Sequence, residues 1–234
     1  MAAALDGQPL GALTGEGATP QAADNGPMQS LLNLTAGAPA AALIMIAMVA
    51  FSLLALTKAP ALLERNLFRP YWLQRRGEYH TLVTSAFLHA DLAHLLFNAF
   101  TFWAFAFSLE RAIGTPRFVA LYFFGLLASD AVTWWRQRGN PEYRSLGASG
   151  AILAVLFASI VYTPSQSIFI LPIPVPIPAP LFALSYLAYT IYASRQQQGR
   201  INHDAHLGGA VAGVLFVLLV DPDAIARAVG QVFA

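Results

Sequence analysis

The sequence contains no cysteine, which excludes structural disulfides and thiol chemistry in this chain of 234 residues. Charge is also scarce, because Asp, Glu, Lys and Arg make up only 11% of the residues, against roughly 25% in an ordinary soluble domain. The basic residues are scattered and the formal net charge is +1, so no basic stripe indicates a nucleic-acid partner. Hydrophobic residues, by contrast, account for 57% of the chain. This balance predicts a membrane protein.

The apolar residues are gathered in blocks, and a helix that crosses a bilayer needs about 17 to 25 such residues. We expect six spans, of which the fifth is the shortest. Their ranges are 40–56, 92–109, 118–135, 146–162, 181–194 and 206–220. The predicted fold is therefore an all-α membrane protein, a six-helix bundle that occupies residues 36–222.

The segments outside the six spans differ in composition. Residues 1–35 are rich in Ala, Gly, Gln and Pro, so we expect a disordered tail there, and a short tail over residues 223–234. The connection 58–90 mixes basic and aromatic residues, which is typical of an amphipathic segment in the membrane interface. Prolines alternate with apolar residues over 172–180, which predicts a stiff polyproline II spacer before the fifth span.

Few polar side chains lie inside the spans, and each is a functional candidate because its burial in lipid is costly. His94 and Asn98 are four residues apart, so they share one face of the second span. Ser149 opens the fourth span, and His206 opens the sixth. Spans two, four and six run in the same direction, so these residues lie at a similar depth near one membrane face. If the three helices are neighbours, the residues form one site.

Small residues surround the two residues that could react. Gly147 and Gly150 flank Ser149, and Gly209 and Gly213 stand on one face of the sixth span. Small residues at this spacing let two helix backbones approach closely. We therefore expect these glycines to bring spans four and six into contact.

The chemistry available to such a site is acyl transfer. A serine hydroxyl becomes a nucleophile when a neutral histidine within hydrogen-bond reach takes its proton, which assigns Ser149 as nucleophile and His206 as base. Asn98, His94 and the backbone N–H of Ser149 are the expected donors to the oxyanion of a tetrahedral intermediate.

Each feature alone has a simpler explanation. The tetrapeptide around Ser149 could be only a packing seam, and His206 could be a packing histidine. A proton-linked transporter using His94, His206 and Asp130 is a further alternative. No HExxH motif is present, and we expect neither a metal ion nor an organic cofactor.

Three stretches together resemble the rhomboid intramembrane serine proteases in their six-span form. They are His94-Leu-Leu-Phe-Asn98, Gly147-Ala-Ser-Gly150 and Ala205-His206-Leu-Gly-Gly209-Ala-Val-Ala-Gly213. The resemblance implies a Ser149–His206 dyad without an acidic third member, which cleaves transmembrane protein substrates in or near their membrane segment. It also implies contact with membrane lipid, and it leaves the oligomeric state open. A catalytically inactive relative that binds membrane clients is the main alternative.

Some positions depart from the family pattern. His80 and Thr81 replace a Trp-Arg pair of the first loop, and Leu153 replaces an aromatic ring four residues after the serine. The resemblance implies a multi-pass protein of a bacterial-type cell membrane whose site opens to the extracytoplasmic side. Ten of the basic residues, from Lys58 to Arg200, would then lie outside, although the positive-inside rule predicts the reverse. We expect the family orientation, because the first loop is predicted to lie in the interface.

Overall fold

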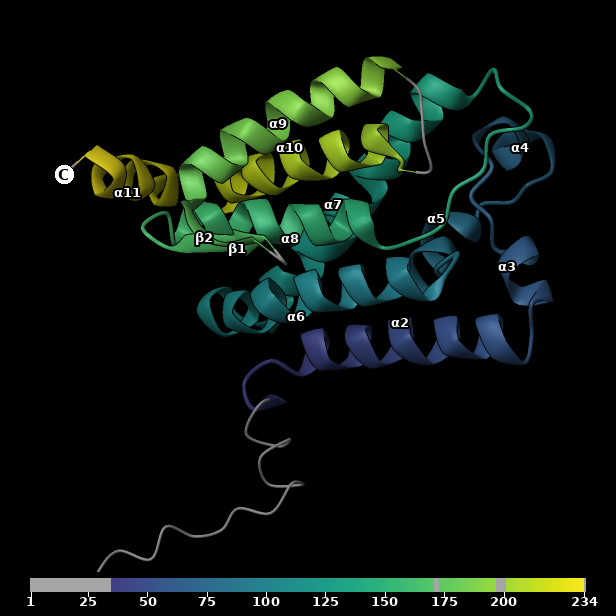
Figure 1. Ribbon diagram of the computed structural model, residues 1–234, viewed down its shortest axis with the longest axis horizontal. Coiled ribbons are helices and arrows are strands. Elements are labelled where there is room, and N and C mark those ends of the chain that lie inside the picture. Colours follow the sequence, from purple (N-terminus) through teal and green to yellow (C-terminus); the bar gives the residue numbers. More distant parts are fainter. Residues whose placement is uncertain (1–34, 171–172, 197–200, 234) are drawn as a thin grey trace, which may run out of the picture. The chain divides into compact units, whose positions relative to one another are not determined.

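The computed structural model describes residues 35–170, 173–196 and 201–233, and six helices in these ranges overlap the six expected spans (Figure 1). The predicted all-α membrane bundle is therefore confirmed. Residues 1–34 of the expected tail lie outside the described residues. The six helices are α2 (Pro39–Thr57), α6 (Leu92–Ile113), α7 (Thr115–Gln137), α8 (Ser149–Tyr162), α9 (Ala179–Gln196) and α10 (His203–Val220).

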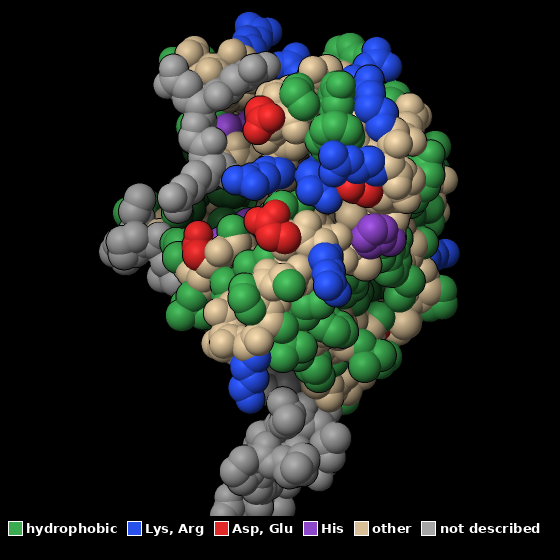
Figure 2. All heavy atoms as spheres, turned by 90° about the vertical axis from the view of Figure 1, so that its right-hand side faces the viewer, with side chains coloured by type: hydrophobic (Ala, Val, Ile, Leu, Met, Phe, Trp, Pro, Cys, Tyr) green, Lys and Arg blue, Asp and Glu red, His purple; other side chains and the backbone are tan. Residues whose placement is uncertain are grey.

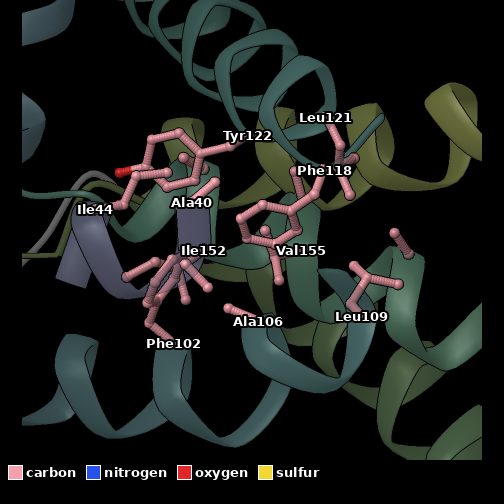
Figure 3. Packing of buried hydrophobic residues seen from close by; sticks show 14 of the residues in the cluster. Ala40, Ile44, Phe102, Ala106, Leu109, Phe118, Leu121, Tyr122, Ile152 and Val155 are labelled. Carbon is pink, nitrogen blue, oxygen red and sulfur yellow. The ribbon is translucent and has the colours of Figure 1, made fainter. Parts of the chain in front are cut away.

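Helix α8 lies at the centre of the bundle. It packs against α6, α7 and α10, and all its residues from Gly150 to Ile160 are buried. Helix α2 packs on α6, and α9 packs on α10, so Figure 1 shows α9, α10, α8, α6 and α2 in succession. Side chains such as Phe102 of α6, Phe118 of α7 and Val155 of α8 meet in the core between them (Figure 3).

The central helix is too short to cross a bilayer. Its 14 residues, at a rise of 1.5 Å each, span about 21 Å, whereas the hydrocarbon core is about 30 Å thick. By length and composition α2, α6, α7 and α10 can cross a membrane, and α8 is a shorter apolar helix. It begins at Ser149, three residues later than the expected range of 146–162.

The first connection consists of short helices rather than one amphipathic segment. These are α3 (Ala61–Arg65), α4 (Pro70–Arg75), α5 (Thr81–Thr84) and the 3₁₀ turn η1 (Ser85–Phe87). Phe68 and Ser145 exchange two backbone hydrogen bonds of 2.9 and 3.0 Å, and the Gly147 N–H donates to the Ser85 carbonyl at 3.0 Å. This connection therefore fixes the position of the loop segment 145–147 that leads into α8.

The departures at His80 and Thr81 fall in this connection. A ring nitrogen of His80 lies 3.3 Å from the carbonyl oxygen of Arg65, and the buried Thr81 hydroxyl donates to the Glu78 carbonyl at 2.7 Å. Glu78 in turn accepts two hydrogen bonds from Arg69, at 3.0 and 3.1 Å. These contacts fix the connection without the Trp-Arg pair.

The prediction of a polyproline spacer is wrong in the described part of that segment. Strand β1 (Ser167–Ile170) pairs with β2 (Ile173–Pro178) in an antiparallel ladder, with Ile168 opposite Ile177. Prolines at every second position of β2 leave the N–H groups of the residues between them on one edge, so that edge can still pair, whereas the proline edge cannot. Pro172 lies outside the described residues.

The end of the bundle away from the site is also organised (Figure 1). The segment expected as a short tail is mostly a helix, α11 (Pro222–Phe233), and Arg227 pairs with Asp221 at 3.0 Å beside it. At the end of α6, the buried Glu110 carboxylate accepts from the N–H groups of Ala40 and Ala41 at 3.1 and 2.6 Å. A carboxylate on the first amides of α2 satisfies donors that have no partner within the helix, so Glu110 anchors α2 to α6.

Candidate active site

Helices α8 and α10 approach each other at two glycines. A Cβ atom on Gly209 would overlap the carbonyl oxygen of Gly150, and one on Gly213 would overlap that of Ala154. Both pairs are four residues apart on their helices, so one straight seam joins the two helices. A Cβ on Gly150 would also overlap the Ser129 side chain of α7. Three of the four expected packing glycines, Gly150, Gly209 and Gly213, therefore lie where helices pack closely.

This seam brings Ser149 and His206 into contact. The Ser149 Oγ and the His206 Nε2 are 2.9 Å apart, which is a hydrogen-bond distance. Both residues lie at the first turn of their helices and are only partly buried, so neither side chain is sealed in the core. Neutral histidine can take the serine proton in this geometry.

The second ring nitrogen of His206 has a partner that the sequence analysis missed. Its Nδ1 lies 2.9 Å from the hydroxyl oxygen of Tyr186 on α9, and the two rings are near parallel with centroids 6.4 Å apart. No motif surrounds Tyr186 in the sequence, and it belongs to the span with the least regular pattern. Its spacing from the other site residues gives no sign of this contact.

His94 and Asn98 of α6 border the same site. A Cβ atom on Gly147 would lie 2.7 and 2.9 Å from the Cε1 and Nε2 atoms of His94, and 3.5 Å from the Nδ2 of Asn98. Both donors therefore stand beside the backbone two residues before Ser149. The Asn98 Nδ2 is buried and has no hydrogen-bond partner in the part of the chain that the structure describes. A buried amide without an acceptor is costly, and an incoming oxygen would relieve that cost.

The start of α8 adds backbone donors. The first N–H groups of a helix have no partner within it, and the helix dipole places partial positive charge there. No side chain caps this end among the described residues. The first N–H groups of α8 thus follow shortly after Gly147, the residue that His94 and Asn98 border, and donors grouped in this way can stabilise negative charge.

Gly147 permits this arrangement through its backbone. Its φ of +114° lies in a region that residues with a Cβ rarely adopt, and the two imidazole contacts leave no space for a side chain. Gly147 therefore lets the loop pass close to the His94 ring. This differs from the contact between spans four and six that was expected of it.

Leu153 lies on α8 one helical turn beyond the site, four residues after Ser149. It is buried in a cluster with Phe157, and Phe182 and Tyr186 of α9 pack against that cluster. The aromatic ring expected near His206 from the family pattern thus comes from α9 in this chain, while α8 contributes an aliphatic side chain.

His89, a further histidine near the site, has a structural contact. His89 is fully buried, its Nδ1 lies 2.9 Å from the Ser52 hydroxyl of α2, and its ring meets that of His94 edge-on at 4.9 Å. Burial, together with the neighbouring His94, lowers the pKa of His89 to about 3, so it is neutral near pH 7. Within residues 35–170, 173–196 and 201–233, no three His, Asp or Glu side chains gather as metal ligands.

Comparison with known proteins adds a further observation. The profile of the Rhomboid domain matches residues 76–222, more than half of the chain. The presenilin-associated rhomboid-like protein A, mitochondrial, of Danio rerio is 33% identical over 138 residues, which cover 58% of this chain and 36% of that protein. For the Rhomboid protein 1, mitochondrial, of Saccharomyces cerevisiae the identity is 29% over 139 residues, 58% of this chain and 40% of that protein.

A plant protein gives a similar match. The RHOMBOID-like protein 12, mitochondrial, of Arabidopsis thaliana is 30% identical over 156 residues, which cover 60% of this chain and 46% of that protein. The chain thus spans less than half of the length of these three relatives.

Proposed function

The chain belongs to the rhomboid family, whose members are generally intramembrane serine proteases, and from this premise we propose that it hydrolyses peptide bonds of transmembrane proteins. Ser149 is the nucleophile and His206 is the general base. The observation that carries the proposal is the 2.9 Å contact between the Ser149 Oγ and the His206 Nε2.

In the first half of the reaction, the Ser149 Oγ attacks the scissile carbonyl carbon while its proton passes to the His206 Nε2. The carbonyl oxygen becomes an oxyanion, for which the donors are the Ser149 N–H, His94 and Asn98. The intermediate then collapses, the C–N bond breaks, and His206 gives its proton to the leaving amine.

In the second half, water cleaves the acyl-enzyme ester. A water molecule gives a proton to the His206 Nε2 and attacks the ester carbon through the same oxyanion position. Loss of the Ser149 oxygen from the new intermediate releases the carboxyl product, and the proton on His206 restores the serine hydroxyl.

The dimensions of α8 support a substrate that lies in the membrane. The helix is shorter than the hydrocarbon core is thick, and we infer that Ser149 is its submerged end. Lipid surrounds such a site laterally, so the proposed partners are transmembrane protein substrates and membrane lipid. A helix hides its carbonyl groups, so the scissile segment must unwind before Ser149 can reach it.

The two alternatives explain less of this arrangement. A protein that only binds membrane clients has no need of a hydroxyl in hydrogen-bond contact with an imidazole at a partly exposed position. A proton-linked transporter would need a path through Asp130, but this residue is buried in α7, and it makes no hydrogen bond to His94 or His206 among the described residues.

The chain is a multi-pass integral membrane protein, and its compartment and orientation are part of the proposal. The relatives are named as mitochondrial proteins, so they give no support to the expected bacterial-type cell membrane. Figure 2 shows Lys and Arg side chains spread over one end of the molecule. Three of the arginines lie over aromatic rings, Arg75 on Tyr71, Arg76 on Trp72 and Arg138 on Trp134.

Such pairs are typical of the membrane interface, so they carry less weight in the positive-inside rule than charges in water-exposed loops. We therefore keep the family orientation, in which the site opens to the extracytoplasmic side.

The proposed activity is tested by cleavage of a model single-span substrate in liposomes. We expect the parent chain to cut this substrate, and the Ser149→Ala and His206→Ala variants to lose cleavage while they keep the melting temperature of the parent in detergent. Cleavage that persists in folded Ser149→Ala would show that another group attacks the peptide bond, and the proposal would then be wrong.

Gly147→Ala is expected to lower the cleavage rate by about 100-fold or more, because the new Cβ pushes His94 away and the loss of one oxyanion donor has an effect of that order. The matched control is Gly139→Ala, in the loop that precedes the site, where a Cβ meets no atom within 4 Å. Equal cleavage rates for the two variants would show that the contact between Gly147 and His94 does not matter for the reaction.

A further inference from the structure

We propose that Tyr186 is a positioning residue of the dyad, which holds His206 in the tautomer and orientation that the reaction needs. This inference rests on the proposed function, and it adds a phenol partner to a dyad that is expected to lack an acidic third member. The structural basis is the contact of 2.9 Å between the Tyr186 hydroxyl oxygen and the His206 Nδ1.

The direction of the hydrogen bonds follows from the role of the base. The His206 Nε2 must be unprotonated to accept the Ser149 proton, so in the neutral ring the proton is on Nδ1. The Nδ1–H then donates to the Tyr186 hydroxyl oxygen. The opposite tautomer would present an N–H to Ser149 and could not act as its base.

The same contact serves the charged ring that forms during the reaction. After the proton transfer both ring nitrogens carry hydrogen, and a donor on a cation makes a stronger hydrogen bond than a neutral donor. The phenol oxygen of Tyr186 therefore stabilises the imidazolium more than the neutral ring. This is the part that a carboxylate plays in a Ser-His-Asp triad, although a neutral phenol contributes less than a full negative charge.

The packing of α9 holds the phenol in place. The Tyr186 ring stacks on Phe182 with centroids 5.6 Å apart and tilts against Phe157 of α8 at 6.0 Å. Leu153 belongs to the same cluster. Because Leu153 has no aromatic ring, the ring beside His206 is that of Tyr186 from α9. Tyr186 both stacks on the imidazole and contacts its Nδ1 through the hydroxyl.

Other titratable side chains also surround the imidazole, and none takes the place of Tyr186. His203 of α10 meets His206 edge-on at 6.0 Å, and Tyr189 of α9 meets His203 edge-on at 5.7 Å. His94 of α6 borders the site beside Gly147. Of these groups, only Tyr186 is at hydrogen-bond distance from a ring nitrogen of His206 in the described ranges.

The test compares Tyr186→Phe with Tyr189→Phe in the full chain. Tyr186→Phe keeps the ring but removes the hydroxyl, and we expect kcat for the single-span substrate to fall about tenfold, the effect of one neutral hydrogen bond, with KM changed less than twofold. Tyr189→Phe removes a hydroxyl from the same helix without a contact to the dyad, and it is expected to keep both constants.

A spectroscopic measurement separates positioning from a general loss of packing. In ¹⁵N spectra of the histidine rings, with His206 identified by its absence in His206→Ala, the parent should show a protonated Nδ1 and an unprotonated Nε2. Tyr186→Phe should show a mixture of the two tautomers, because the partner that selects one of them is gone.

The two proposals fail in different ways. A parent chain that does not cleave the substrate, or cleaves it equally well as Ser149→Ala, contradicts the proposed function. A cleaving parent whose Tyr186→Phe variant keeps the same kcat and the same tautomer overturns the role of Tyr186 alone.

Discussion

A chain that carries both Ser149→Ala and His206→Ala is expected to cleave the substrate no more slowly than either single variant. The two side chains act as one unit, because the hydroxyl is a weak nucleophile without its base and the imidazole has no proton to take without the hydroxyl. In a soluble serine protease, loss of either residue lowers kcat by roughly 10⁶-fold and their effects do not add. We expect a loss approaching that size here, as far as the assay can follow it.

The measurement is the cleavage rate in liposomes for the parent, the two single variants and the double variant, with equal amounts of folded protein. Rate losses that multiply in the double variant would mean that Ser149 and His206 contribute independently. The 2.9 Å contact would then not be the reacting pair.

The Gly209→Ala substitution is expected to have the largest effect on folding. The added Cβ would overlap the carbonyl oxygen of Gly150, which is backbone and cannot rotate away, so α8 and α10 must move apart. Overpacking of this kind typically costs about 1–3 kcal/mol and occasionally more. Because the seam also sets the distance between Ser149 and His206, cleavage should fall together with the melting temperature in detergent.

Gly230→Ala is the matched control for this substitution. Gly230 is also helical, in α11, but a Cβ there meets no atom within 4 Å. Alanine is favoured over glycine in a helix by about 1 kcal/mol, so this variant should be as stable as the parent or slightly more stable. If Gly209→Ala melts as the parent does and cleaves normally, the two helices do not depend on the glycine seam.

The six main helices could be predicted because lipid constrains sequence strongly. A spanning helix needs a long apolar block, and such blocks identified six helices within a few residues, namely α2, α6, α7, α8, α9 and α10. Polar groups are rare in these blocks, so Ser149, His206, His94 and Asn98 could be selected as a small set. Topology placed them at one depth, and the structure has them at the same end of neighbouring helices.

Features that depend on packing between distant segments could not be predicted. Tyr186 meets His206 through the position of α9 on α10, which no local pattern encodes. Glu110 comes directly after the expected span 92–109, where it reads in the sequence as an ordinary charged residue at a helix terminus. Its role needs the start of α2, 70 residues earlier in the chain.

Local propensity also misled in two places. Alternating prolines exclude a helix, but they are compatible with both an isolated polyproline segment and an edge strand. The segment is a strand here because it pairs with β1 (Ser167–Ile170). The last residues were expected as a short tail because they follow the final apolar block. They form α11 instead, a helix with apolar and polar residues on different faces. Over only 12 residues, that helical periodicity is a weak pattern in the sequence.

The most direct test of the reacting pair is covalent labelling with a fluorophosphonate, followed by mass spectrometry of the labelled peptide. In this reaction the serine oxygen bonds to phosphorus and fluoride leaves, which is fast only where a base takes the hydroxyl proton. We therefore expect the label on Ser149 in the parent, very little in His206→Ala and none in Ser149→Ala. Tyr189→Phe should be labelled as the parent is. A folded parent chain that takes up no label at Ser149, or that is labelled equally well without His206, would contradict the account.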